Sequence, residues 1–101
     1  MASATLPPVH PSVEKARQAP PRILIVDDEP EVLALLNDLV GRQLDCSIFH
    51  ATSVAEAKRQ INRDGIELMI TDLALPDGDG MALVSHLNDK QPSAASIVIT
   101  G

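Results

Sequence analysis

Three acidic side chains follow two apolar stretches of the chain. Asp27 and Asp28 come directly after residues 23–26, and Asp72 comes directly after residues 66–71. Nearly continuous apolar stretches of this length are typical of parallel strands that are covered on both faces. Ligands of such sheets bind beyond the carboxyl ends of the strands. The sequence therefore predicts a group of carboxylates at one end of a parallel sheet.

Capping is the simpler role for some of these acids. Asp72 alone could accept hydrogen bonds from the loop that follows it, and Asp28 or Glu29 could serve a helix that begins near Pro30. Capping does not also account for Asp27. Three neighbouring carboxylates repel one another unless a cation or shared protons compensate. Oxygen ligands with room for water suit Mg²⁺, so we expect magnesium as the cofactor.

The segment after Asp72 is rich in proline and glycine, and it contains Pro76, Gly78 and Gly80. The two glycines lack the lysine, the hydroxyl residue and the spacing of a phosphate-binding loop. We therefore interpret them as turn residues in a loop that shapes the surroundings of Asp72.

Strands and helices alternate along the rest of the sequence. Ser53 and Glu56 have the spacing of a capping box, which places a helix start at this point. The alternation predicts an α/β fold in which crossover helices connect parallel strands. The expected elements are a strand over 23–26, a helix over 30–44, a strand over 46–50, a helix over 54–62, a strand over 66–71, a helix over 81–89 and a strand over 96–99.

The order and spacing of the acids, the loop and the last strand match those of a known family. The matching pieces are Asp27-Asp28, the loop Asp72-x-x-Leu75-Pro76-x-x-Asp79-Gly80, and Thr100-Gly101 after the strand 97–99. Over residues 22–101 the chain resembles the response regulator receiver domain of two-component signalling. The resemblance implies a flavodoxin-like α/β fold, with a parallel sheet in the order 2-1-3-4 and helices on both faces.

The same resemblance implies a phosphorelay function. A sensor histidine kinase or a phosphotransfer protein would pass a phosphoryl group from a phosphohistidine to Asp72, which becomes an acyl phosphate. Asp28 and Asp72 would bind Mg²⁺ directly, Asp27 would hold it mostly through water, and the backbone carbonyl of Ala74 would be a further ligand. Thr100 would hydrogen-bond a phosphoryl oxygen. The domain is then a signalling phosphoacceptor and not an enzyme that acts on a separate substrate.

Kinase docking is the implied role of the first helix, over 30–44. Its apolar arc is wider than the ~100° of a stripe that only faces a core. We therefore expect Leu33 and Leu35 to stay partly exposed and to contact the kinase.

Members of this family continue through a further helix, a fifth strand that carries a lysine, and a final helix, whereas this sequence stops after the fourth strand. We expect residues 96–100 to form an exposed edge strand and to promote self-association. A second function stays open for the same reason. A fragmentary or degenerate receiver could act as a protein-interaction module without being phosphorylated.

Composition narrows the partners and the compartment. A formal net charge of −6 disfavours direct contact with nucleic acid or an anionic membrane. The single Cys46 cannot form an internal disulfide, so we expect the reducing cytoplasm. Residues 1–21 hold five of the eight prolines without a periodic apolar pattern, which predicts a disordered tail.

Overall fold

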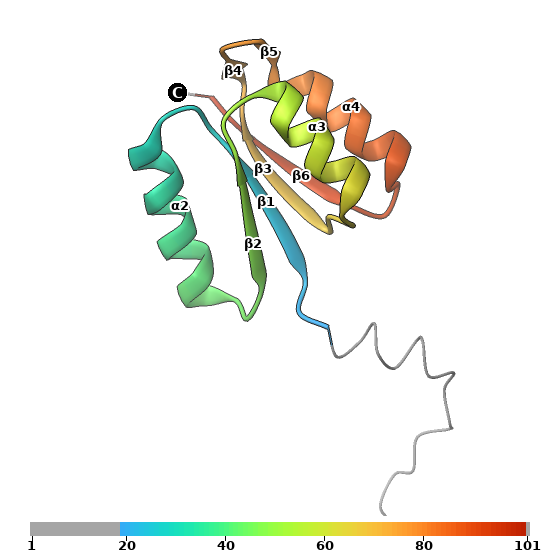
Figure 1. The fold of residues 1–101 in the computed structure, drawn as a ribbon. Coiled ribbons are helices and arrows are strands. Elements are labelled where there is room, and N and C mark those ends of the chain that lie inside the picture. Colours follow the sequence, from blue (N-terminus) through green and yellow to red (C-terminus); the bar gives the residue numbers. More distant parts are fainter. Residues whose placement is uncertain (1–18, 101) are drawn as a thin grey trace, which may run out of the picture.

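The computed structural model describes residues 19–100, which form a four-stranded parallel sheet, a short hairpin and three helices (Figure 1). Among these residues, no helix is both long and apolar enough to cross a membrane. The tail predicted over 1–21 falls largely outside the described residues. The elements are β1 (Arg22–Val26), α2 (Pro30–Gln43), β2 (Ser47–Ala51), α3 (Val54–Arg63), β3 (Leu68–Asp72), β4 (Ala74–Leu75), β5 (Gly78–Asp79), α4 (Gly80–Lys90) and β6 (Ala95–Ile99).

The strands of the sheet lie in the order β2-β1-β3-β6, and every neighbouring pair is parallel. This confirms the predicted order 2-1-3-4, since β6 is the fourth strand of this sheet. Val26 pairs with Thr71, and Asp72 pairs with Ile99. The register therefore brings the carboxyl ends of β1, β3 and β6 to the same end of the sheet.

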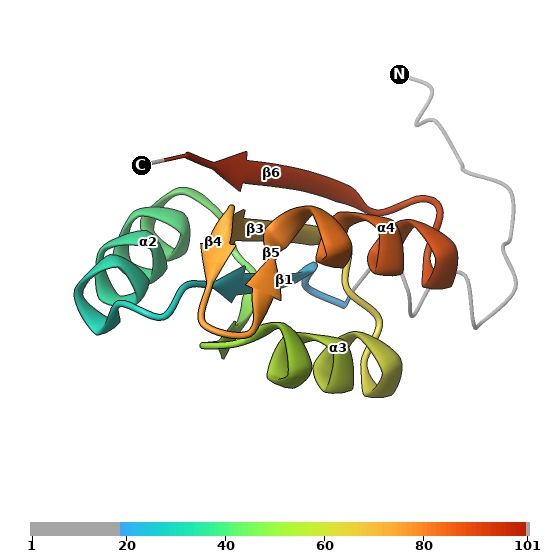
Figure 2. The ribbon, with the colours of Figure 1, turned by 90° about the horizontal axis from the view of Figure 1, so that it is seen from above.

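The helices lie on both faces of the sheet, as predicted. Figure 2 shows α2 apart from the pair formed by α3 and α4, which pack against each other. Apolar side chains from α3, α4 and the strands beneath them form the core. The apolar residues Met69 and Met81, which lie near the loop after Asp72, are both expected from the sequence to fill the core. Met69 is fully buried there, but the expectation for Met81 is wrong, because its side chain is 49% exposed. This core cluster consists of Leu24, Val26, Ala51, Val54, Ala57, Ile61, Ile66, Met69, Leu75, Leu83 and Leu87. Ile23, Ile25 and Ile70 alternate with its strand residues and are also buried.

Helix α2 covers its face of the sheet less completely. All residues of α2 are described by the structure, and none of them is fully buried. Leu33 is half-buried, whereas Leu35 is 58% exposed and Leu39 is 50% exposed. The partial exposure predicted for Leu33 and Leu35 agrees with these values. The wide apolar arc of α2 is thus shared between the sheet and the surface.

The predicted capping box at the start of α3 is only half formed. The Ser53 hydroxyl accepts a hydrogen bond from the backbone N–H of Glu56 at 3.1 Å. The Glu56 carboxylate does not return to Ser53 but accepts from the Thr52 hydroxyl at 3.1 Å. Glu29, one of the two acids that could cap α2, is its N-cap residue but makes no side-chain capping bond.

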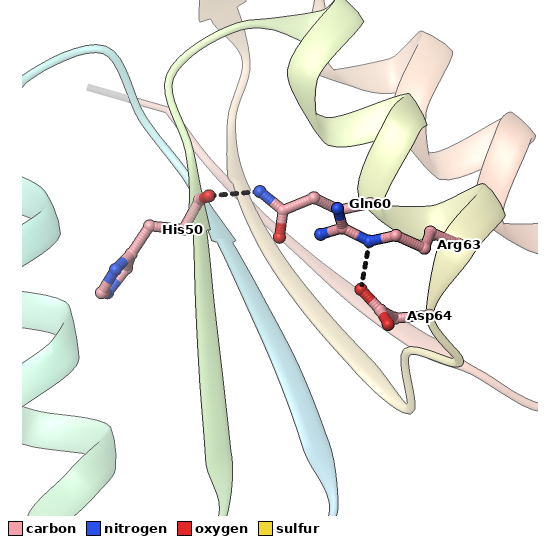
Figure 3. A network of polar contacts seen from close by, with 4 residues as sticks. All are labelled: His50, Gln60, Arg63 and Asp64. Atoms are coloured by element: carbon pink, nitrogen blue, oxygen red, sulfur yellow. Dashed lines mark hydrogen bonds and ion pairs between the residues drawn. The ribbon is translucent and has the colours of Figure 1, made fainter.

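The edge strand β2 is held from both sides through His50. Its backbone carbonyl accepts from the side-chain amide of Gln60 on α3 (Figure 3). On the other side, the His50 ring contacts Asn37 of α2 at 3.0 Å. At the end of α3, Arg63 pairs with Asp64 at 3.2 Å, as Figure 3 also shows. The bond from Gln60 occupies a backbone carbonyl of the edge strand β2 and limits its pairing with another chain.

Candidate functional site

The three predicted carboxylates meet at the carboxyl ends of β1 and β3. Asp27, Asp28 and Asp72 each place a carboxylate oxygen within 4.8 Å of the other two. Asp27 is buried, Asp28 is exposed and Asp72 is half-buried. The cluster therefore extends from the sheet to the surface.

The backbone around Asp27 fixes one side of this cluster. The Asp27 N–H donates to the carbonyl of Ala51 at 3.1 Å, which extends the pairing of β1 with β2 by one residue. One Asp27 carboxylate oxygen accepts from the N–H of Glu29 at 2.9 Å. A buried side chain held in this way cannot easily turn away from the cluster. Asp27 is accordingly the most firmly placed of the three carboxylates.

The loop after Asp72 folds back onto the end of β3. The Gly80 N–H donates to the carbonyl of Leu73 at 2.7 Å. A Cβ atom at Gly80 would lie 2.2 Å from the backbone carbonyl oxygen of Asp72. The buried Thr71 hydroxyl donates to the same carbonyl at 3.0 Å. Only glycine fits at position 80, which explains its place in the predicted loop.

Between Leu73 and Gly80 the loop forms the hairpin of β4 and β5. Its turn has Pro76 in the second position and Gly78 in the fourth, as a type I turn favours, and none of the described residues has a positive φ. The Asp72 carboxylate accepts from the N–H of Ala74 at 3.4 Å, and Asp79 caps α4 by accepting from Met81 at 2.7 Å. The hairpin thus joins the end of β3 to the start of α4.

The other predicted residues lie around this end of the sheet without joining the carboxylate cluster. Thr100 follows β6 and is exposed, and its neighbour Ile99 pairs with Asp72. Leu33 and Leu35 lie in the first turns of α2, which begins three residues after Asp27.

The cluster has the chemistry of a site for a hard cation. All three side chains offer oxygen ligands, which suit Mg²⁺ or Ca²⁺ better than softer metals. Asp28 is exposed and Asp72 is half-buried, so water can reach a cation held between them, whereas Asp27 is buried beneath. The residues therefore fit a magnesium ion that keeps part of its water shell.

A family model for the response regulator receiver domain matches residues 23–101. The chain belongs to the response regulator receiver family. It is thus a receiver of two-component phosphorelay signalling, with the flavodoxin-like fold that the sequence predicted. Among its relatives, the response regulator protein PilR of Pseudomonas aeruginosa is 39% identical over 80 residues, which cover 78% of this chain and 18% of PilR. The receiver therefore spans about a fifth of that relative's length.

Solved structures of other response regulators share this fold. TrrA from Thermotoga maritima, in complex with Mg²⁺ and beryllium fluoride, matches with a TM-score of 0.73 and 29% identity over 79% of this chain and 69% of TrrA. A response regulator from Burkholderia pseudomallei with a phosphorylated aspartic acid and a calcium ion also gives a TM-score of 0.73, at 27% identity over 80% of this chain and 47% of that one.

The role of Asp77 in this receiver was not predicted from the sequence. Its carboxylate oxygens accept from the N–H groups of Val54 at 2.7 Å and Ala55 at 3.0 Å, at the start of α3. The bond from Ala55 and then the bond from Val54 lower the pKa of Asp77 below its ordinary value of 3.8. The Pro-Asp-Gly turn signals a bend, but it does not reveal a partner more than twenty residues upstream.

Proposed function

We propose that Asp72 of this receiver accepts a phosphoryl group from the phosphohistidine of a sensor histidine kinase or a phosphotransfer protein. A carboxylate oxygen attacks phosphorus while the P–N bond breaks, and the electron pair of that bond stays on the imidazole. The product is an acyl phosphate, and the protein acts as a signalling module. The observation that supports this function is the meeting of three carboxylates within 4.8 Å at the ends of two parallel strands.

The surroundings of the three acids support Asp72 as the acceptor. Asp27 is buried and accepts a backbone hydrogen bond, so its access to a phosphohistidine on another protein is limited. Asp72 is half-buried and begins the loop that Gly80 closes. This position gives Asp72 both access from outside and a rigid support.

The donor set supports Mg²⁺ as the cofactor. Asp28 and Asp72 would hold the ion directly, Asp27 would hold it mostly through water, and the Ala74 carbonyl would complete the protein ligands. Bound there, the cation offsets the repulsion between the anionic carboxylate and the anionic phosphoryl group. The protein contributes a fixed group of oxygen atoms whose own repulsion the ion relieves.

Thr100 is the proposed contact for the transferred phosphoryl group. It follows Ile99, the residue that pairs with Asp72, and its hydroxyl is a hydrogen-bond donor at this end of the sheet. A bond that forms only in the phosphorylated state shifts the population towards one conformation. The neighbours with a phosphorylated aspartate or bound beryllium fluoride support this function, and they lend no support to an unphosphorylated interaction module.

Asp72→Asn tests the acceptor, because the substitution keeps the shape and removes the nucleophile. We expect it to abolish labelling by radioactive acetyl phosphate in the presence of Mg²⁺. Asp45→Asn, which changes an exposed acid after α2, is the matched control and should label normally. Label on the Asp72→Asn protein would show that a different residue accepts the phosphoryl group.

Leu33 and Leu35 are the proposed kinase contacts, supported by their exposure at the start of α2. Leu35→Ser should slow phosphotransfer from the kinase and leave labelling by acetyl phosphate unchanged. The control is Leu44→Ser, since Leu44 is 48% exposed and directly follows the far end of α2, about 14 Å from Leu35. Equal loss of both reactions in Leu35→Ser would indicate misfolding instead of lost docking.

Self-association through β6 is also part of this proposal. Within residues 19–100, β6 pairs only with β3, and Ile97 is 51% exposed. An apolar edge without charge or proline is a template for pairing with a second copy.

The proposed compartment is the cytoplasm. The chain has the single cysteine Cys46, so an oxidising compartment would give it no internal disulfide.

A further inference from the structure

The hairpin that follows Asp72 is attached to α3 as well as to β3. Figure 1 shows the β4–β5 hairpin at the same end of the sheet as the start of α3. Asp77, in the turn of this hairpin, accepts from Val54 at 2.7 Å with one oxygen and from Ala55 at 3.0 Å with the other. Both donors belong to the first turn of α3, where backbone N–H groups have no partner within the helix.

An apolar contact accompanies these two hydrogen bonds. A Cβ atom at Gly78 would lie 3.3 Å from a Val54 methyl group, so the backbone of β5 sits directly against this side chain. Val54 is buried, and it belongs to the core on this face of the sheet. The turn is therefore fixed to α3 by two bonds to a single carboxylate and by close packing beside it.

Short connections lead from this attachment back to the carboxylate cluster. In the hairpin, Leu75 pairs with Gly78 and Ala74 pairs with Asp79. Ala74 donates its N–H to the Asp72 carboxylate at 3.4 Å. The position of the Ala74 backbone is thus set at one end by β3 and at the other by the contact of Asp77 with α3.

We infer that Asp77 is a positioning residue for the phosphoacceptor site: it holds the β4–β5 hairpin on α3 and thereby fixes the oxygen atoms of Ala74 and Asp72 that bind the cation. This inference rests on the proposed function, since it concerns the same cation. It assigns Asp77 no contact with the cation or with the phosphoryl group.

A cap that only stabilises α3 would have different consequences, and Ser53 separates the two roles. The Ser53 hydroxyl accepts from Glu56 at 3.1 Å at the same end of α3, but it has no part in the hairpin. Ser53→Ala therefore weakens the helix start without releasing the loop. Asp77→Ala weakens the helix start and also releases the loop.

The test is the affinity for Mg²⁺ of the 101-residue chain, followed through the backbone amide NMR signals of the acidic cluster. We expect Asp77→Ala to raise the dissociation constant for Mg²⁺ about tenfold. Loss of a group that orients metal ligands typically weakens metal affinity by about 10–100-fold, and this is the lower end of that range. Ser53→Ala should leave the dissociation constant unchanged, because the Ser53 hydroxyl bonds to Glu56 of α3 and not to the loop. An unchanged affinity in Asp77→Ala, or an equal loss in both variants, would overturn the inference.

Amide hydrogen exchange without metal provides the second measurement. Asp77→Ala should speed exchange at Val54, Ala55 and the hairpin residues 74–79, whereas Ser53→Ala should affect only the start of α3. If wild type binds no Mg²⁺, the proposed function fails, and exchange still decides whether Asp77 holds the hairpin. If Asp77→Ala does not fold, Asp77→Asn keeps one acceptor oxygen and should show smaller changes in the same direction. Wild-type affinity and exchange in that variant would overturn the inference.

Discussion

On one face of the sheet α3 and α4 pack side by side over the strands, whereas on the other face of the described domain α2 lies alone (Figure 2). The first face contains Leu83 and Leu87 with almost no exposed surface. On the second face, Leu39 of α2 and Ile97 of β6 are each about half exposed. We call these the closed face and the open face.

The phosphoacceptor site depends on the two faces in different ways. The hairpin after Asp72 is held from the closed face, through Gly80 at the start of α4 and through Asp77 at the start of α3. The open face contributes the proposed contacts with other proteins, through Leu35 and through β6. Rigid support and recognition are thus assigned to opposite sides of one sheet.

Truncation of one leucine on each face gives the largest expected contrast in stability. Leu83→Ala removes a fully buried side chain and should lower the free energy of unfolding by about 2–5 kcal/mol. Leu39→Ala removes a side chain that is 50% exposed and should lower it by less than about 1 kcal/mol. Urea unfolding measures both values. Equal losses would show that the open face contributes as much stability as the closed face.

Two glycine-to-alanine substitutions sharpen the same comparison. Gly80→Ala places a methyl group 2.2 Å from the Asp72 carbonyl and should destabilise the protein by about 1–3 kcal/mol. Gly41→Ala, in α2, meets only the end of the Ile48 side chain at 3.9 Å and should stabilise the protein by about 0.5–1 kcal/mol. Thermal unfolding distinguishes the opposite signs. A stable Gly80→Ala protein would mean that the loop after Asp72 is free to move.

Local sequence signals were sufficient to predict the strands of the sheet and the grouping of the three carboxylates. Apolar stretches identified the strands, and Asp27, Asp28 and Asp72 needed only their positions at the strand ends to be grouped correctly. The short strands β4 and β5 were not predicted, because two residues are too few for an apolar period to appear. The sequence therefore predicted where the site lies better than it predicted how its loop is held.

Contacts between distant segments account for the remaining errors. Nothing near Asp77 indicates that its partners are Val54 and Ala55, since that contact exists only after α3 and β3 have packed. Met81 is apolar and lies at the start of a helix, yet about half of its side chain is exposed. Which side of a short helix is covered depends on its tertiary neighbours, which a helical period alone does not determine.

Self-association tests the free edge of β6, whose exposed residue Ile97 lies on the open face. Ile97→Lys places a charge on the exposed side of β6 and should shift the protein towards the monomer. Asn88→Lys adds the same charge at an exposed position of α4 and should leave the association unchanged. Sedimentation velocity over a range of concentrations measures both. A wild-type protein that stays monomeric throughout would contradict pairing through β6.

The smallest expected effect is a dependence of the free energy of unfolding on pH, which arises from Asp77 on the closed face. The N–H groups of Ala55 and Val54, with a further contribution from Lys58, hold the pKa of Asp77 below its ordinary value of 3.8. In the acid range the unfolded chain therefore binds more protons at this residue than the folded protein does, and stability rises with pH. The contribution of Asp77 is complete above about pH 5 and is lost as the pH falls below 3.8 and through the pKa of the folded state.

Urea unfolding of wild type and Asp77→Asn at several pH values measures this contribution. The difference between the two proteins should be constant above about pH 5 and should shrink at lower pH, since protonation removes from wild type what the amide removes from the variant. Ser53→Ala is the control, because a hydroxyl does not titrate in this range and its difference from wild type should not follow the same curve. A difference for Asp77→Asn that stays constant down to pH 3 would mean that the charge of Asp77 does not stabilise the contact between the hairpin and α3. The attachment would then depend on the packing of Gly78 against Val54.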